Sequence, residues 1–402
     1  HLEKRTRETL SGRMAELSAL VDLVRESIRG ARETEVPVYA SQRATIASDA
    51  LRRAEVLLQE GDWPQAAALT EFAATSCDSA RVLLTFASLT PELGVPGPMP
   101  SATSLDIRDG AFYASASEPV FLFGFHDPAA NPRSLALLDR YGLNFAAIEV
   151  SPADLLLEGG VNLDTMARID TYLENADALG IGVTVGLAAD IAPAWLGSTA
   201  PPASPETQGP ARVRDPREAR ALGQRHLDAV APLLERHPSV NGISLASAPA
   251  FRWETEEVRQ SFQQAVVRKY NEDRRAVNRA WRTHMRVLDD IQILWDYEQP
   301  SYQYDWQTWH QHLVSSHFTW LAEYADRTLS GLPVQITLSD TVLQTGEART
   351  GIDRQVLAGI AEVTACTASY TFGESMYAVP FTGPDLSFRL LRSLAPAHPL
   401  MV

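Results

Sequence analysis

Apolar residues near the start of the chain recur at the three- and four-residue spacing of an amphipathic helix. The clearest run lies within a helical pattern that extends from Arg5 to about Leu89, and it comprises Met14, Leu17, Leu20, Val21, Val24 and Ile28. A second run spans 46–58, and a third follows Trp63. These runs predict a small helical bundle, for which we expect a structural or docking role.

This pattern stops in the stretch 90–101, TPELGVPGPMPS, which is rich in proline and glycine. Proline removes backbone donors and both residues interrupt periodicity, so the composition is typical of a linker. We therefore predict a domain boundary here. A helical segment with its linker covers residues 1–100, and a second domain covers residues 101–402.

Beyond the boundary, short apolar runs alternate with amphipathic stretches. A hairpin is predicted over 105–113, around Asp109-Gly110. Strands are predicted at 120–125, 145–150, 183–187, 242–246, 334–338 and 363–370, and helices at 131–141, 163–179, 217–235 and 307–330. This alternation of apolar strands and helices predicts a parallel sheet buried on both faces. A closed barrel and a doubly wound sheet both satisfy the pattern.

The final residues 399–402 (PLMV) follow a helix predicted at 385–394 and resemble the start of a seventh strand. An eight-stranded barrel also needs the rest of strand seven, strand eight and their helices, so we expect a barrel on this chain to be truncated near strand seven. The chain begins with His1, and residues 1–10 are too polar for a signal peptide, so we expect an upstream segment to have been removed or left out. For location we favour secretion or the periplasm over the cytoplasm.

The net charge limits which partners the chain can bind, and the cysteine content indicates the state of its thiols. The chain holds 35 basic and 50 acidic residues, a formal charge of −15, which repels phosphate backbones and anionic lipid. No apolar run reaches the roughly 20 residues of a membrane span. We therefore expect no nucleic acid and no membrane as partner. Cys77 and Cys366 fall in separate predicted domains, which indicates two buried structural thiols.

Polar residues follow the predicted strands. In a barrel, the active site forms at the carboxyl ends of the strands. The residues at or near those ends include His126, Glu149, Asp190, Ser247, Asp340 and Tyr370. We expect them to converge on one mouth, although a helix cap or turn explains any single carboxylate equally well.

Aromatic residues gather near the same ends. Trp253 follows the fourth strand, and a dense group precedes the fifth, namely Trp295, Tyr297, Tyr302, Tyr304, Trp306 and Trp309. Sugar rings present C–H faces that stack on aromatic planes, so such a group near a barrel mouth indicates a carbohydrate cleft. We expect about half of these rings to belong to the core instead.

Three stretches carry a resemblance to a known family: LALLDRYGLNFAAIE at 135–149, GIGVTVGLAADIAPAWL at 180–196 and RHPSVNGISLASAPAF at 236–251. They resemble the retaining glycoside hydrolases of clan A, and family 42 β-galactosidases in particular. Trp195 matches a Pro-x-Trp-Leu element after the third strand of that family. Tyr270 and VNRAW at 277–281 match elements after its fourth strand. The helical segment before residue 100 is outside this resemblance.

The resemblance implies a (β/α)8 barrel and a β-linked glycan or galactoside as substrate, cleaved by two carboxylates about 5 Å apart. The acid/base Glu of the family falls on Ala248, which cannot transfer a proton, and Ser247 replaces the neighbouring Asn. The nucleophile is expected just beyond Val402, and Tyr370 matches the Tyr that bonds it. His126, Glu149, Asp190, Trp195, Trp253 and Asp340 are expected to contact substrate.

Several interpretations stay open at this point. The chain is an inactive form of a retaining glycosidase, through natural divergence or an engineered Glu→Ala change, or it is a carbohydrate-binding pseudoenzyme. An oligomeric scaffold that associates through its N-terminal helices is a third alternative. A metal or cofactor is not expected, because His310 and His312 lie on different faces of a helix and no phosphate-binding glycine loop follows a strand.

Overall fold

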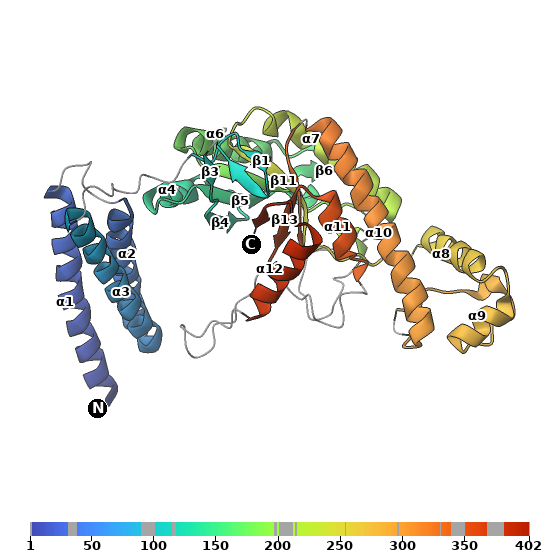
Figure 1. Ribbon diagram of the computed structural model, residues 1–402, viewed down its shortest axis with the longest axis horizontal. Helices are drawn as coiled ribbons and strands as arrows, with labels where there is room; N and C mark the ends of the chain where they lie inside the picture. Colours follow the sequence, from blue (N-terminus) through green and yellow to red (C-terminus); the bar gives the residue numbers. More distant parts are fainter. Residues whose placement is uncertain are drawn as a thin grey trace. The chain divides into compact units, whose positions relative to one another are not determined.

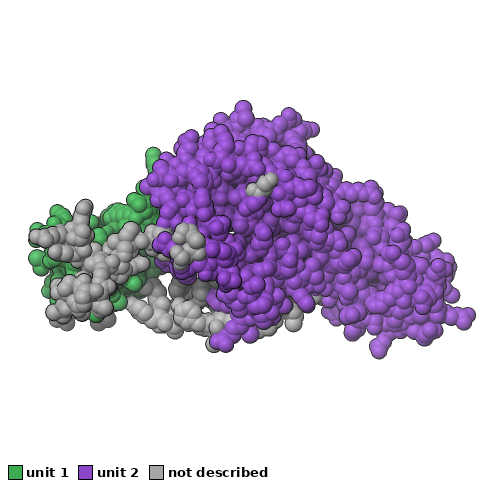
Figure 2. Space-filling model, turned by 45° about the horizontal axis from the view of Figure 1, so that its top comes forward, with its two compact units in different colours: residues 1–100, 133–144, 372–378 green, residues 101–132, 145–371, 379–402 purple. Residues whose placement is uncertain are grey.

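The computed structural model describes residues 2–30, 38–89, 101–114, 118–196, 199–200, 212–213, 215–253, 255–295, 297–329, 331–338, 350–367 and 382–401. These residues form two compact units (Figure 2). The first holds the N-terminal helices and residues 133–144, and the second holds the rest of the described chain. Each unit is described by itself.

Three long helices build the first unit: α1 (Leu2–Gly30), α2 (Val38–Glu60) and α3 (Trp63–Leu89). The predicted amphipathic face of α1 is confirmed, since Met14, Leu17, Val21 and Val24 are buried. Between α2 and α3 the buried residues are largely alanines, namely Ala44, Ala47, Ala54, Ala66, Ala73 and Ala80. Small side chains let two helix backbones approach closely, so α2 and α3 form the tightest pair.

The short helix α4 (Pro132–Arg140) joins this unit through polar contacts with α2. The Tyr141 hydroxyl donates to the Asp49 carboxylate, and an Arg140 nitrogen lies 3.2 Å from the same carboxylate. Gly142 follows at φ +66°, where a Cβ would collide with Gln42. A glycine is required there because it alone adopts this backbone conformation freely.

The second unit is built on a seven-stranded sheet in which every pairing is parallel. Its strands are β4 (Gly124–Asp127), β5 (Phe145–Glu149), β8 (Gly182–Gly186), β11 (Val240–Ser247), β12 (Val334–Leu338), β13 (Val363–Cys366) and β14 (Leu400–Met401). They are neighbours in sequence order, whereas a doubly wound sheet reverses its order part-way. The chain therefore forms a partial (β/α)8 barrel, and β4 and β14 are the edges of the sheet.

Helices and small hairpins connect these strands (Figure 1). They are α5 (Pro152–Leu155), β6 (Leu156–Leu157), β7 (Gly160–Val161), α6 (Leu163–Leu179), β9 (Thr199–Ala200), β10 (Arg212–Val213), α7 (Pro216–Leu234), α8 (Glu256–Lys269), α9 (Arg274–Trp281), the 3₁₀ turn η3 (Leu288–Asp290), α10 (Pro300–Thr328), α11 (Arg354–Ile360) and α12 (Thr382–Leu394). The helix boundaries follow local signals. Asn162 caps α6 and Gly180 ends it at φ 67°, and Asp215 caps α7 directly before Pro216.

The first predicted strand is wrong in extent. Val120 belongs to β3 (Pro119–Val120), which joins β1 (Asp106–Arg108) and β2 (Ala111–Tyr113) of the predicted hairpin in a separate three-stranded antiparallel sheet. The barrel strand starts at Gly124, where a Cβ would fall 1.5 Å from the carbonyl oxygen of Phe145. Close approach to β5 therefore requires glycine there, a constraint that hydrophobic periodicity does not reveal.

Candidate functional site

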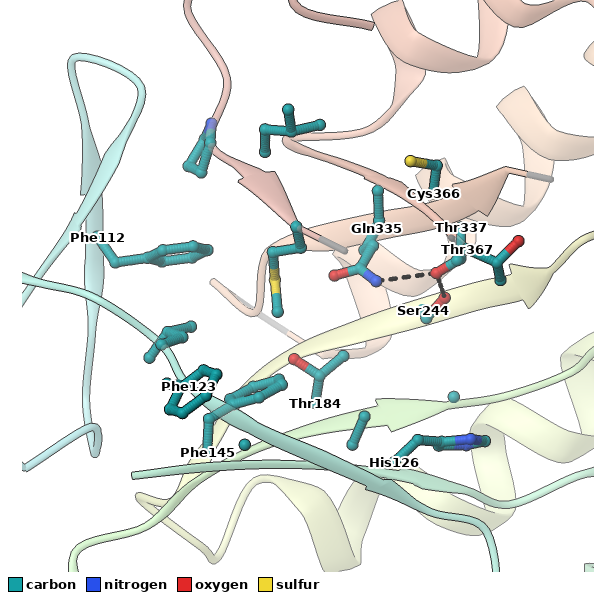
Figure 3. A pocket seen from close by; sticks show the side chains of 18 of the residues that line it. Phe112, Phe123, His126, Phe145, Thr184, Ser244, Gln335, Thr337, Cys366 and Thr367 are labelled. Atoms are coloured by element: carbon teal, nitrogen blue, oxygen red, sulfur yellow. Dashed lines mark hydrogen bonds between the residues drawn. The ribbon is translucent and has the colours of Figure 1, made fainter. Parts of the chain in front are cut away.

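The inward face of the sheet lines a cavity of about 710 Å³ (Figure 3). Side chains of a strand alternate between its two faces. In β12, Gln335 and Thr337 line the cavity, whereas their neighbours Val334 and Ile336 belong to the apolar core and do not line it. In β8, Thr184 lines the cavity and its neighbour Val183 does not. The polar residues inside these apolar strands therefore mark the cavity wall, a signal that the sequence carried and the predictions missed.

One wall of the cavity is polar and hydrogen-bonded. The Gln335 amide nitrogen donates to the Thr337 hydroxyl at 2.9 Å, and the Ser244 hydroxyl lies 3.3 Å from the same oxygen. Figure 3 shows this chain of contacts next to Thr367. The Ser244 hydroxyl donates to the Ala246 carbonyl oxygen at 3.2 Å, so the capacity left in this group is the second N–H and the oxygen of the Gln335 amide and the remaining lone pairs of the hydroxyls. The wall can therefore bind a polyhydroxylated ligand.

The facing wall is aromatic. Phe112 projects from strand β2 of the hairpin, Phe123 from the segment just before β4, and Phe145 from β5 (Figure 3). Phe121 and Phe123 keep 74% and 55% of their surface exposed, and their ring centroids lie 6.3 Å apart at an interplanar angle of 28°. Large exposed apolar side chains in a cluster mark interaction sites. The cavity thus presents rings on one side and hydroxyl and amide groups on the other.

Three of the predicted site residues meet in this cavity. His126 comes from β4, Glu149 from the end of β5 and Ser247 from the end of β11, and all three line it. Gly186, the last residue of β8, pairs with Glu149 of β5. Because Gly186 has no side chain, there is room beside the carboxylate. Among the described residues that line the cavity, Glu149 is the one carboxylate.

Ala248 directly follows β11 and the cavity-lining Ser247, but it is not itself among the residues that line the cavity. Its backbone is unusual. Its N–H donates to the Thr337 carbonyl oxygen at 2.8 Å, and the register of β11 on β12 shifts between Ser244 and Ser247. The Ala248 φ is +45°, a left-handed conformation that costs a non-glycine residue roughly 1–2 kcal/mol. Ala188, just after β8, shares this feature at φ +42°. Such strained residues gather at functional sites, here at the carboxyl ends of two strands.

Other predicted residues lie apart from the cavity lining. Asp190 is buried and its backbone oxygen accepts from Val213 N. Trp195 is half-buried, and its indole N–H donates to the Leu156 carbonyl at 3.0 Å. Trp253 is fully buried, with its ring 4.7 Å from that of Phe251, so it packs in the core rather than on the cavity wall. Asp340 and Tyr370 lie outside the described residues.

The dense aromatic group before strand five forms mostly core. Trp306 and Tyr302 are 1% exposed, and Phe262 of α8 and Trp281 of α9 pack with them. The one strongly exposed ring is Tyr304, at 64%. These rings join α8, α9 and α10 in a layer outside the sheet, and the predicted carbohydrate cleft gains little from them.

The same layer buries His310, one of the two histidines weighed as metal ligands, and also His317. His310 stacks on Trp306 at 5.1 Å, and burial lowers its pKa to about 4. Burial likewise lowers the pKa of His317 to about 3. In the part of the chain that the structure describes, no three His, Cys, Asp or Glu residues lie close enough together to hold a metal ion. No helix among those residues is long and apolar enough to span a membrane.

Comparison with known proteins identifies the fold. No protein-family model matches the chain, and no curated protein sequence is similar to it. A solved structure of a family 42 exo-carrageenase from Bacteroides ovatus matches with a TM-score of 0.66 over 98% of this chain, at 15% identity. The chain therefore shares the (β/α)-barrel fold of this structure. The match extends over the N-terminal helices as well, because they make up far more than the unmatched 2%.

Two β-galactosidase structures match the chain at 14% identity. The enzyme from the psychrophilic Marinomonas ef1 covers 68% of this chain with a TM-score of 0.52, and a catalytic mutant of Gan42B from G. stearothermophilus covers 71% with the same score. The chain spans 58% of the exo-carrageenase and 47% and 46% of the two β-galactosidases. Identities this low establish the barrel fold and leave the activity to be argued from the site.

Proposed function

We propose that this protein is a retaining glycoside hydrolase-type barrel that binds a β-linked glycan in the cavity and does not cleave it, because Ala248 occupies the acid/base position. The observation that carries the proposal is the cavity itself, with phenyl rings facing hydroxyl and amide groups. Sugars combine apolar C–H faces with polar rims, so the two walls match both properties of such a ligand.

The chemistry of Ala248 explains the absence of turnover. A retaining enzyme needs one carboxyl group to protonate the leaving oxygen and a second to attack the anomeric carbon. The Ala248 methyl group carries no proton to give. Glu149 enters the described cavity from another strand, two strands away from β11. Glu149 therefore contributes to binding, where its carboxylate accepts hydrogen bonds from sugar hydroxyls.

The first ligands to test follow from the structural neighbours. Because those proteins are an exo-carrageenase and β-galactosidases, galactose-containing oligosaccharides are the natural starting panel. Binding is measured by isothermal titration calorimetry against β-linked galactosides, glucosides and xylosides, with α-linked oligosaccharides as the comparison. We expect binding of at least one β-linked oligosaccharide. Failure of the whole panel to bind at millimolar concentration contradicts the proposal.

A matched pair of variants ties binding to the cavity. Phe123→Ser removes an exposed ring of the aromatic wall, and Leu163→Ser changes a side chain that is 75% exposed on α6, outside the cavity lining. Neither change opens the core. We expect Phe123→Ser to weaken glycan binding at least tenfold, which is about 1.4 kcal/mol, and Leu163→Ser to leave it unchanged. Equal affinities for the two variants would place the glycan elsewhere.

Azide tests whether a nucleophile is present. A dinitrophenyl β-galactoside needs no acid to release its leaving group, so a retaining nucleophile forms the glycosyl-enzyme even with alanine at 248. Azide then attacks the anomeric carbon and gives a glycosyl azide with retained configuration. Formation of this product identifies a glycosidase that lacks only its acid/base group. Its absence, together with glycan binding, identifies a binding protein without a nucleophile.

A further inference from the structure

Arg392, in the last turn of α12, lines one end of the cavity. Its Nη1 donates to the His398 carbonyl oxygen at 3.2 Å, in the segment that leads into β14. On the other side lies the turn of the β1–β2 hairpin, where a Cβ on Gly110 would fall 3.4 Å from the same nitrogen. Because Gly110 has no side chain, the hairpin turn lies directly beside the guanidinium group.

Most of the hydrogen-bonding capacity of this guanidinium group is unused within the described part of the chain. A guanidinium group carries five N–H donors, and the bond to His398 takes one of them. Among the described residues, no carboxylate lies within ion-pair distance of Arg392. The remaining donors form a planar fork that matches two oxygens of one anionic group.

The two charged groups of the cavity lie at opposite ends of it. Arg392 is the one arginine or lysine among the described residues that line the cavity, and Glu149 is the one carboxylate. Glu149 ends β5, whereas Arg392 is bonded to the segment before β14, and all strands of the sheet run parallel. Phe145, which begins β5, also lines the cavity, so the cavity follows that strand for about 13 Å.

The net charge of the chain does not decide which ligands enter the cavity. A formal charge of −15 repels anions at long range. At physiological ionic strength the Debye length is about 8 Å, so carboxylates farther away are largely screened. The groups inside the cavity therefore determine its preference, and the end at Arg392 is positive.

We propose that the cavity selects an acidic glycan, in which Arg392 binds a carboxylate or sulfate-ester group of the sugar chain. Glu149 then accepts hydrogen bonds from sugar hydroxyls at the other end. This inference rests on the proposed function and adds a substrate class to it. A neutral glycan keeps the aromatic contacts and the hydrogen bonds to β12, and it lacks only the charge-assisted bonds, which are about twice as strong as neutral ones.

Matched ligands test the substrate class by isothermal titration calorimetry. They are a neutral β-linked oligosaccharide that the wild-type protein binds, the same oligosaccharide with a terminal uronate, and the same oligosaccharide with one sulfate ester. We expect at least one acidic form to bind at least tenfold tighter than the neutral form, and this advantage to shrink as salt is added. The tighter acidic form identifies the anionic group. Equal or weaker binding of both acidic forms overturns the inference, while binding of the neutral form still supports the proposed function.

Variants of Arg392 then test whether this side chain provides the selection. Arg392→Met keeps a long side chain without charge, so we expect the acidic advantage to disappear while the affinity for the neutral form stays within threefold of wild type. Arg392→Lys keeps the charge and loses the fork of donors, so it should retain part of the advantage. If Arg392→Met does not fold without its bond to His398, Arg392→Lys and the wild-type ligand comparison carry the test.

Arg268→Met is the matched control. Arg268 is also an exposed arginine in the last turn of a helix, α8, and its Nε donates to the Gln264 carbonyl oxygen at 3.3 Å. It lies outside the cavity lining, so Arg268→Met changes the net charge equally and should keep the full acidic advantage. An advantage that persists in Arg392→Met, or that falls equally in Arg268→Met, would overturn the role of Arg392. If the wild-type protein binds neither neutral nor acidic glycans, the proposed function fails and this inference falls with it.

Discussion

The buried carboxylate of Asp305 is the most sharply testable feature of the helical layer. Its oxygens accept from the Tyr270 hydroxyl at 2.7 Å and the Trp281 indole N–H at 2.8 Å, and Lys269 forms an ion pair with it. The Asp305 side chain is 3% exposed, whereas Lys269 is 47% exposed. One carboxylate therefore joins the ends of α8 and α9 to α10.

The free-energy cost of Asp305→Ala follows from the hydrogen-bond donors that it leaves without an acceptor. Trp281 is fully buried, so its unsatisfied N–H costs about 1–3 kcal/mol, and the half-buried Tyr270 hydroxyl costs somewhat less. Lys269 turns to water, and an ion pair with one exposed partner contributes at most about 1 kcal/mol. We expect Asp305→Ala to lower the free energy of unfolding by about 3–5 kcal/mol, and Asp305→Asn by less, since the amide oxygen still accepts.

Asp228 provides the matched control for this experiment. It accepts from the Tyr324 hydroxyl at 2.6 Å on an exposed surface, so Asp228→Ala should cost less than about 1 kcal/mol. Urea unfolding followed by tryptophan fluorescence measures both variants, because every tryptophan except Trp63 lies beyond residue 100. Equal losses for Asp305→Ala and Asp228→Ala would refute the reasoning, since water would then satisfy the stranded donors.

Three further predictions concern pH and backbone strain. Burial lowers the pKa of His226, His310 and His317 to about 4, 4 and 3, so stability should hold above pH 6.5 and fall as pH drops toward 4; a flat urea midpoint over this range would contradict it. Burial raises the pKa of Tyr302 to about 12, so stability should hold below pH 10 and fall toward pH 12, as checked by ultraviolet titration alongside unfolding. Ala248→Gly should raise the free energy of unfolding by about 0.5–1 kcal/mol by relieving the positive φ, and a loss in urea unfolding would show that no strain is stored there.

Local patterns determined several helices well, although α8, α9 and α11 were not among the helices predicted after residue 100. The predicted helix at 163–179 coincides with α6, because Asn162 and Gly180 are themselves the cap and the stop. The amphipathic face of α1 is buried as its spacing requires. The parallel sheet and all seven of its strands were also predicted, the first with the wrong extent, since an apolar run buried on both faces is a local property of the chain.

The site was predictable only in part. Because strand ends converge in any parallel barrel, the sequence placed His126, Glu149 and Ser247 together, and the structure brings all three to one cavity. That Ala248 occupies the acid/base position stays a prediction from the family resemblance. The cavity walls were not predicted, although the alternating phenylalanines around Phe123 and the single polar residues inside apolar strands carried the signal.

Tertiary packing decided the rest. Sequence order of the strands, which selects the barrel over a doubly wound sheet, depends on pairing between distant segments. The start of β4 depends on the approach of β5 to Gly124. The aromatic residues at 295–309 were predicted to line a carbohydrate cleft in part. Whether a ring such as Trp306 faces a cleft or the core depends on which helix covers it. A side chain's chemistry is local, whereas its burial and its neighbours belong to the whole fold.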